Sequence, residues 1–495
     1  MSPAPLPQPS QDPRGGPSPA TNPGAKAPEE RLWLLLACFL GLIRFWNLGQ
    51  WSLWLDEVYT LADSYHGVGN YNWPAYALVR WTVEALGDQP SAFSLRFLPA
   101  LAGWLAIPAA WWALRPWIGG PRAALVALSP WEVYWSQTAR FYTLVQLSSL
   151  LGAGFVLRGL LRNSIPTACT GLGIAALGAF FHLQAVIVSL ALACGPALAW
   201  LKLRDRGSSG GGSGREDSDL LPTRVVAALA AFVALVGLVS APWALEHFHE
   251  YMQKKQDPPL ASVLHLIRST AYFVTPALSA AALIGAVVIW RARDVRGTVL
   301  LGIVASGAGC LTLAGAFARA SAQYGLAFMP FVCALALWVT SMEPLRARRG
   351  LRLAVVVVLC APLLAGLGLY FTTQYGQRPR WQEAYEYVDS LRGDQDLVLG
   401  MQAPVGEFYL VPGTTQLRNP RLVRWCDRTR PRAWRSAVKT GRTLWVVVRP
   451  AFLTEWEPDD REAFEGFLRD TCRLQRRFPV RQEGRDLDVE VYRHR

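Results

Sequence analysis

The sequence is poor in charged residues. Only 17% of its 495 residues are Asp, Glu, Lys or Arg, whereas a soluble protein carries roughly a quarter. No internal repeat is visible, and the eight cysteines show no metal-ligand spacing. Because 52% of the residues are hydrophobic and 21 are Trp, the composition excludes fibrous proteins, disordered proteins and small disulfide scaffolds. It indicates a membrane protein with a minor aqueous part.

The hydrophobic residues are gathered in runs of the length that crosses a lipid bilayer, roughly 17 to 25 residues. Arg-rich joints separate the runs. We therefore expect an α-helical polytopic membrane protein. The eleven predicted spans are residues 32–49, 93–114, 121–137, 141–157, 165–182, 184–201, 223–244, 271–290, 297–317, 323–341 and 353–372.

The basic residues indicate an orientation in the membrane. With the N-terminus in the cytoplasm, the inner joints carry 19 Lys and Arg and the outer joints carry eight, as the positive-inside rule requires. An odd number of spans then leaves the C-terminal tail outside. Since the cations lie at the ends of hydrophobic runs, the net charge of +13 is explained by topology, and no nucleic-acid surface is predicted.

Three regions follow from this pattern. Residues 1–30 are rich in Pro and are predicted to be a disordered cytoplasmic tail. Residues 31–375 form the transmembrane part, in which the Gly/Ser stretch 207–214 is a flexible cytoplasmic linker. Residues 376–495 are predicted to form a small α/β domain on the outer face.

Within the predicted outer domain, helix-like and strand-like stretches alternate. They are helices at 381–391 and 459–468 and strands at 396–400 and 443–449. Cys426 and Cys472 are the two cysteines of this domain. They would form a disulfide in an oxidising compartment or remain two free thiols.

Asp56 and Glu57 stand out just after the first span, behind the aromatic residues Trp46, Trp51 and Trp54. Carboxylates at the membrane surface are costly unless they are paired, metal-bound or hydrated, so they indicate a function. Adjacent residues on a helix point about 100° apart. One carboxylate should therefore face the substrate, while the other holds the first in position. The alternative is a helix N-cap or a solubilising pair.

A second feature is the short outer hairpin that ends in Arg140 and Tyr142, where the fourth span opens. The free N–H groups of a helix N-terminus, with an arginine beside them, suit a phosphate, and near a bilayer that phosphate could belong to a lipid. The alternative is an arginine that extends to the lipid headgroups.

Other polar residues on the outer side are less specific. His182 ends the fifth span, and a lone histidine at an interface more often makes a structural hydrogen bond than acts as a catalyst. Arg319 and Tyr324 lie between the ninth and tenth spans and would form a second phosphate clamp or cap two helices. Glu246, His247 and His249 follow the seventh span, where a metal site would need a further ligand.

The order of these outer motifs is similar to the order found in the GT-C fold glycosyltransferases that use polyprenyl-phosphate sugars. The resemblance is in particular to bacterial relatives of dolichyl-phosphate-mannose protein mannosyltransferases (family 39-like). The resemblance covers about residues 33–398. The motifs that carry it are Leu53 to Glu57, Ser94 to Gly103, Ser129 to Tyr142, Phe181–His182, Arg319 with Tyr324 and Pro330, and Pro379 to Ala384.

The resemblance implies an enzyme of the bacterial inner membrane that transfers a sugar, with inversion, from a polyprenyl-phosphate carrier such as undecaprenyl phosphate. Asp56 matches the catalytic acidic residue and Glu57 its partner, Arg140 and Tyr142 match the motif that opens the fourth span, and His182 matches the family histidine. From charge and location, Arg140 and Arg319 are assigned to the carrier phosphate, with Tyr142 and Tyr324 beside them.

Some questions stay open within the resemblance. Some relatives bind a divalent metal ion, and this sequence does not decide whether one is needed. Aminoarabinose lipid A transferases carry Glu-Lys-Pro-Pro in the first outer loop, whereas this chain has Tyr71-Asn72-Trp73-Pro74. The acceptor is therefore open among protein, lipid and glycan.

Two other classes of function compete with the enzyme. A transporter or flippase of lipid-linked saccharides should carry ionisable groups near the middle of its spans and show repeated halves, but the span centres are nearly all apolar. A non-catalytic envelope-assembly protein would use the outer domain for binding alone.

Overall fold

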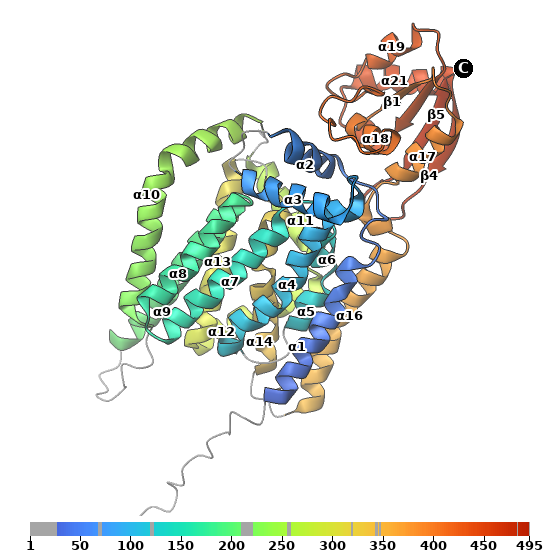
Figure 1. Ribbon diagram of the computed structural model, residues 1–495. Coiled ribbons are helices and arrows are strands. Elements are labelled where there is room, and N and C mark those ends of the chain that lie inside the picture. The colour runs from blue at the N-terminus through green and yellow to red at the C-terminus, as the bar shows by residue number, and fades with distance from the viewer. Residues whose placement is uncertain are drawn as a thin grey trace, which may run out of the picture.

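The computed structural model describes residues 27–67, 72–118, 123–208, 221–254, 259–317, 320–341, 345, 348–482 and 484–494. Nearly all of the predicted N-terminal tail and most of the Gly/Ser linker lie outside these ranges. The described chain is a bundle of helices with a smaller part that contains a sheet at one end (Figure 1).

The helical bundle is formed by the first three quarters of the chain. Its α-helices are α1 (Ala27–Gly41), α2 (Leu55–His66), α3 (Trp73–Leu86), α4 (Ala92–Ile118), α5 (Ala123–Leu128), α6 (Pro130–Ser136), α7 (Tyr142–Leu161), α8 (Ile165–Leu177), α9 (Gln184–Ser208), α10 (Thr223–Lys254), α11 (Pro259–Phe273), α12 (Pro276–Ala292), α13 (Val295–Phe317), α14 (Met329–Trp338) and α16 (Arg349–Phe371). Short 3₁₀ turns include η1 (Leu42–Phe45), η2 (Gly178–Phe180) and η4 (Ala322–Phe328).

In the described part of the chain, five helices are long and apolar enough to cross a membrane by length and composition: α4, α7, α9, α13 and α16. A sixth span is possible if the bent pair α11 and α12 is counted as one. Shorter apolar helices cover Ile165–Phe180, Thr223–Val239 and Ala322–Trp338. The chain is thus an integral membrane protein by these criteria.

Each of the eleven predicted segments overlaps a helix, but the count of eleven spans stays a prediction. Two segments differ from the expectation of one straight helix. Residues 121–137 break at Ser129 and Pro130 into α5 and α6, because proline cannot continue the hydrogen-bond ladder. Residues 271–290 begin on the 105° bend between α11 and α12, where Pro276 opens α12.

Glycines allow some of the bundle helices to approach closely. A Cβ on Gly152 of α7 would lie 2.6 Å from the carbonyl oxygen of Gly171 on α8, and a Cβ on Gly171 would lie 2.5 Å from that of Gly152. Helices α9 and α13 also approach closely: a Cβ on Gly195 would meet the Ile303 backbone, and a Cβ on Gly302 would meet the Gly195 carbonyl oxygen. Backbones in contact gain dispersion energy, which drives helix association where no water is present.

The C-terminal part contains one five-stranded sheet. Its strands are β1 (Leu397–Gly400), β2 (Val423–Trp425), β3 (Leu444–Val448), β4 (Cys472–Phe478) and β5 (Val489–His494), in the order β2-β1-β3-β5-β4. β1 pairs in parallel with β2 and β3, while β5 pairs antiparallel with β3 and β4. The helices are α17 (Trp381–Leu391), α18 (Ala403–Leu410), α19 (Ala433–Val438), α20 (Pro450–Leu453) and α21 (Pro458–Thr471).

The helices and strands predicted in this part are confirmed. Residues 381–391 form α17, residues 459–468 lie within α21, and the strands at 396–400 and 443–449 correspond to β1 and β3. Cys426 and Cys472 are both free thiols.

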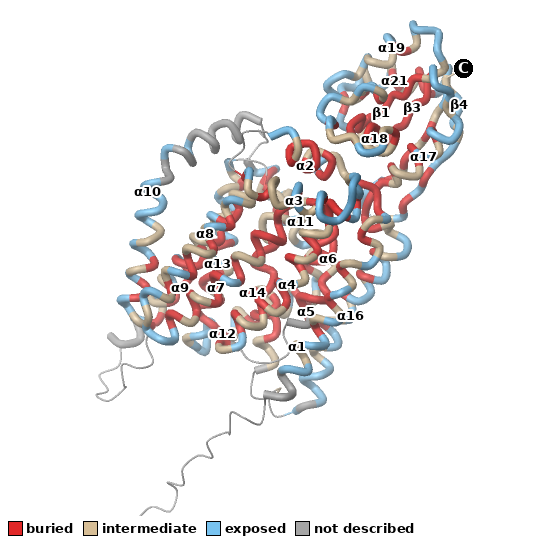
Figure 2. The backbone as a smooth tube through the Cα atoms, in the orientation of Figure 1, coloured by how far each residue is buried: buried red, intermediate tan, exposed pale blue. Residues whose placement is uncertain are grey.

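Two short helices, α2 and α3, lie across the end of the bundle next to the C-terminal part (Figure 1). Figure 2 shows buried backbone running through α2 and the strands, whereas α16 is largely exposed along its length. Several contacts link α2 and the residues before it to the C-terminal part. The Tyr409 hydroxyl accepts from the Leu53 N–H at 2.8 Å, Arg418 forms a two-bond ion pair with Asp63, and Ser52 accepts from the Gln382 N–H.

Candidate active site

The first turn of α2 separates the two adjacent carboxylates. Glu57 is fully buried, while Asp56 is exposed. The Glu57 carboxylate accepts a hydrogen bond from the Trp54 N–H at 2.9 Å and so satisfies one of the free donors at the helix start. Its negative charge near the N-terminus also suits the helix dipole. Because Glu57 turns inward, Asp56 is left facing outward.

Glu57 is held by two buried arginines. Arg96 on α4 donates to both of its oxygens at 2.8 and 2.9 Å, and Arg378, just before α17, donates at 2.7 Å. The Ala139 N–H adds a fifth donor at 2.8 Å. Burial alone would raise the pKa of Glu57, but the charges of Arg378 and Arg96 outweigh burial and lower it to about 2. Glu57 is therefore ionised at neutral pH and serves as an anchor for three segments.

The same arginines fix the loops on either side. Arg96 also donates to the carbonyl oxygens of Leu48, Trp51 and Ser52. Arg378 donates to the Gln137 carbonyl and to the Thr138 hydroxyl, at 2.8 and 2.7 Å. The loop before α2 and the loop before α7 are thereby bound to one charged centre.

Asp56 faces a cavity of about 710 Å³. This volume lies within the roughly 300–1,000 Å³ of pockets that hold small-molecule ligands. Its lining includes Arg140 and Tyr142, as well as Arg268 on α11 and Arg485 on the loop between β4 and β5. Three guanidinium groups from distant parts of the chain thus lie around one exposed carboxylate, an arrangement suited to an anionic ligand.

Arg140 is placed between the cavity and α2. It is partly buried and donates to the Thr60 hydroxyl at 3.2 Å, one turn beyond Asp56. Burial acts to lower the pKa of Arg140, but Tyr142 and Asp56 outweigh it and raise the pKa. The charge of Asp56 therefore acts on Arg140 across the cavity. Tyr142 is the first residue of α7 and lines the cavity, so the N-terminus of that helix, with its free N–H groups, lies beside the cavity.

Tyr142, His182 and Tyr324 form a cluster of rings. The His182 ring centroid lies 5.2 Å from that of Tyr142 and 5.5 Å from that of Tyr324. His182 Nδ1 accepts from the Gln184 N–H at 3.2 Å, and the Gln184 side chain donates to the Tyr324 carbonyl. Of the three, only Tyr142 lines the cavity with Asp56. The rings of His182 and Tyr324 both pack against the Tyr142 ring.

Several predicted residues are not placed by the structure. Arg319 lies outside the described residues. Glu246, His247 and His249 are on α10, but their side chains are not described. Among the described residues, no group of three His, Cys, Asp or Glu side chains could hold a metal ion.

The sequence reasoning missed several polar residues of the cavity, among them His265, Arg268, Gln402 and Arg485. His265 and Arg268 are one turn apart on α11, and they could have been noticed as two basic residues on one face of a helix that has no other charged side chain. Arg485 follows no motif and reaches the cavity only because β4 and β5 fold into a hairpin.

No known protein-family profile matches the sequence, and no curated protein matches it. Solved structures do match. The oligosaccharyltransferase of Archaeoglobus fulgidus in its apo form is 12% identical, with a TM-score of 0.51, over 86% of this chain and 70% of that one. ArnT from Cupriavidus metallidurans in the apo state is 13% identical, with a TM-score of 0.50, over 95% of this chain and 98% of that one.

Coverage differs between these proteins. In a second structure of the A. fulgidus enzyme, with Zn and sulfate, this chain spans 58% of that chain's length. ArnT matches almost end to end, and that protein has also been solved bound to undecaprenyl phosphate. Both neighbours are GT-C glycosyltransferases, and at these identities the likeness shows the fold. The chain has the GT-C fold.

Proposed function

We propose that this protein is a membrane glycosyltransferase that moves a sugar from a polyprenyl-phosphate carrier to an acceptor, with inversion at the anomeric carbon. The observation that carries the proposal is the cavity in which the Asp56 carboxylate shares a lining with Arg140, Arg268 and Arg485. The GT-C fold supports it, and ArnT binds undecaprenyl phosphate in one of its structures.

The chemistry needs a base and a site for a departing anion. Asp56 accepts the proton of an acceptor hydroxyl, whose oxygen attacks the anomeric carbon on the face opposite the phosphate. The bond between that carbon and the phosphate oxygen breaks, and the phosphate keeps the electron pair. The phosphate thereby gains about one negative charge at neutral pH, which the three arginines stabilise.

Glu57 acts as a positioning residue in this scheme. It lies in the wall of the cavity, but it is fully buried and its two oxygens already accept from five donors, so it is committed to these partners. By fixing the start of α2 and the loop before Arg140, it sets the distance between the base and the phosphate site. Small displacements of such groups reduce rates strongly.

A second cavity gives the lipid chain a path. It has a volume of about 650 Å³ and shares Tyr272 and Phe273 with the first cavity. Its other wall includes Gly366 and Leu369 of α16, the candidate span with the smallest buried share, 22%. A carrier phosphate among the arginines could therefore extend its apolar chain past α11 toward the lipid side of α16.

The proposed setting is the bacterial inner membrane, with the N-terminus in the cytoplasm and residues 376–495 outside. The excess of basic residues on the inner joints supports this orientation. Both cavities lie at the end of the bundle where the C-terminal part sits, because residues of the β4–β5 loop line each of them. The reaction would then take place on the outer face.

The test uses the purified full chain in lipid nanodiscs. A panel of polyprenyl-phosphate sugars, each labelled in the sugar, is added together with an envelope extract as the source of acceptor. We expect at least one donor to lose its label from the lipid fraction. If every donor keeps its label while the protein remains folded, the proposal is wrong.

A further inference from the structure

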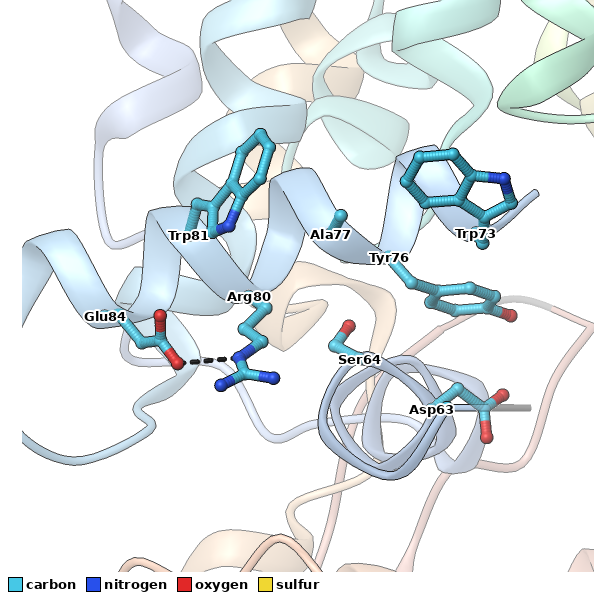
Figure 3. A pocket seen from close by; sticks show the side chains of 9 residues that line it. Asp63, Ser64, Trp73, Tyr76, Ala77, Arg80, Trp81 and Glu84 are labelled. Carbon is cyan, nitrogen blue, oxygen red and sulfur yellow. Dashed lines mark hydrogen bonds and ion pairs between the residues drawn. The ribbon is translucent and has the colours of Figure 1, made fainter. Parts of the chain in front are cut away.

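A third, smaller hollow lies between α2 and α3 and shares no lining residue with the two larger cavities. It has a volume of about 250 Å³, below the roughly 300–1,000 Å³ of pockets for drug-sized ligands. Figure 3 shows Trp73 and Trp81 at two points along α3, with Asp63 and Ser64 of α2 below. A space of this size suits one or two sugar rings.

The two tryptophans present their rings to the outside. Trp73 is 65% exposed and Trp81 63% exposed, although the buried side of α3 packs Ala75, Val79 and Val83 into the core. They are eight residues apart, which is roughly 12 Å along a helix. Indole faces are apolar and carry one donor at the edge, so they can stack on the C–H face of a sugar.

Polar groups complete the hollow. Arg80 and Glu84 pair at 2.8 Å with about half of each side chain exposed, and both line the space. Asp63 is 5% exposed and pairs with Arg418 of the C-terminal part. The charges are therefore balanced, and the exposed oxygen and nitrogen atoms can bond hydroxyl groups. A membrane-facing surface would instead bury these charged groups at a cost.

The hollow and the catalytic cavity are both lined by residues of α2. Asp63 and Asp56 are seven residues apart, so they lie on the same face of the helix, about 10 Å from each other along its axis. Tyr76 lines the hollow and packs its ring 5.2 Å from Phe141, next to Arg140. A chain of sugar rings held in the hollow would follow α2 toward Asp56.

We propose that this hollow binds a sugar unit of the acceptor, and that the acceptor is a saccharide. This inference rests on the proposed glycosyl transfer and names its acceptor class among the three left open by the sequence. Trp73 and Trp81 provide the stacking surfaces, and the side chains of Arg80, Glu84 and Ser64 provide the hydrogen bonds.

Saturation-transfer NMR on the full chain in nanodiscs tests binding directly. The probes are methyl glycosides and disaccharides of glucose, galactose, mannose and N-acetylglucosamine. We expect signal from at least one probe. Trp73→Ala or Trp81→Ala should raise its Kd roughly three- to tenfold, while Trp73→Phe, which keeps a ring, should retain most of the affinity. Trp46→Ala is the matched control, since Trp46 is also 65% exposed but does not line the hollow.

The outcomes separate this inference from the proposed function. Binding that persists in Asp56→Asn while transfer is lost supports both. Binding without transfer from any donor leaves the saccharide site in place and overturns the proposed function. Transfer without binding of any saccharide overturns the inference. If no saccharide binds and brominated phospholipids quench the fluorescence that Trp73 and Trp81 contribute, the two rings contact the bilayer and the inference is wrong.

Discussion

Replacement of Glu57 by Gln should destabilise the protein far more than the loss of one charge at its surface. Glu57 neutralises the buried Arg96 and Arg378, both without exposed surface. In Glu57→Gln, an amide N–H₂ group would face the donors that the carboxylate now accepts, and two buried cations would lose their anion. Breaking one partner of a buried ion pair costs about 3–5 kcal/mol.

The pKa of Glu57 points in the same direction. It is lowered because the charges of Arg378 and Arg96 favour the ionised carboxylate in the folded protein. Thermal unfolding in detergent measures the effect. The matched control is Glu465→Gln, because Glu465 pairs with Arg461 at the surface, where both side chains are nearly half exposed. That pair is worth about 0.3–0.5 kcal/mol.

The effect should depend on pH with a defined sign. Since the folded-state pKa of Glu57 lies below its unfolded value, its contribution is complete above about pH 5 and is lost as the pH falls toward 2. The difference in Tm between wild type and Glu57→Gln should therefore shrink with acidification. Equal Tm values for Glu57→Gln and Glu465→Gln at neutral pH, or a difference that grows in acid, would refute the reasoning.

Two further predictions concern the anion site and the helix contacts. Arg268→Ala removes one guanidinium from the cavity and should raise the Kd for polyprenyl monophosphate roughly tenfold or more in a nanodisc binding assay; an unchanged Kd would remove Arg268 from the phosphate site. Gly152→Ala places a Cβ 2.6 Å from the Gly171 carbonyl and should destabilise the bundle by about 1–3 kcal/mol. Gly173→Ala on the same pair of helices meets nothing within 4 Å and should leave Tm nearly unchanged, so equal losses would argue against the close contact.

Local patterns in the sequence predicted the elements of the fold well. The amphipathic stretch at 381–391 has the bounds of α17, and the two buried parallel strands β1 and β3 were recognised from their apolar runs. Strands β2, β4 and β5 were missed. β4 reads Cys-Arg-Leu-Gln-Arg-Arg-Phe, and its exposed arginines hide the alternation that marks a strand. The breaks inside predicted spans were also missed. They arise at proline residues and at bends between packed helices, and a hydropathy average over a whole span does not detect them.

The candidate site was predictable only where the function lies in a short motif. Asp56 and Arg140 were found because a carboxylate and a cation at the membrane surface are conspicuous, and both line one cavity. The partners of Glu57 could not be foreseen, because Arg96 and Arg378 lie 39 and 321 residues away. Arg485 reaches the cavity from the last strands, and no spacing rule connects it to α2.

The most direct test of the account is the rate of sugar release from a labelled polyprenyl-phosphate donor under single-turnover conditions. Asp56→Asn should slow release by roughly 10²–10⁴-fold, as expected for loss of a general base, while the Kd for polyprenyl phosphate stays within a few-fold of wild type. Asp389→Asn is the control, because Asp389 is a half-exposed carboxylate on α17 that pairs with Arg392. If Asp56→Asn transfers sugar as fast as Asp389→Asn, Asp56 is not the base and the proposed mechanism is contradicted.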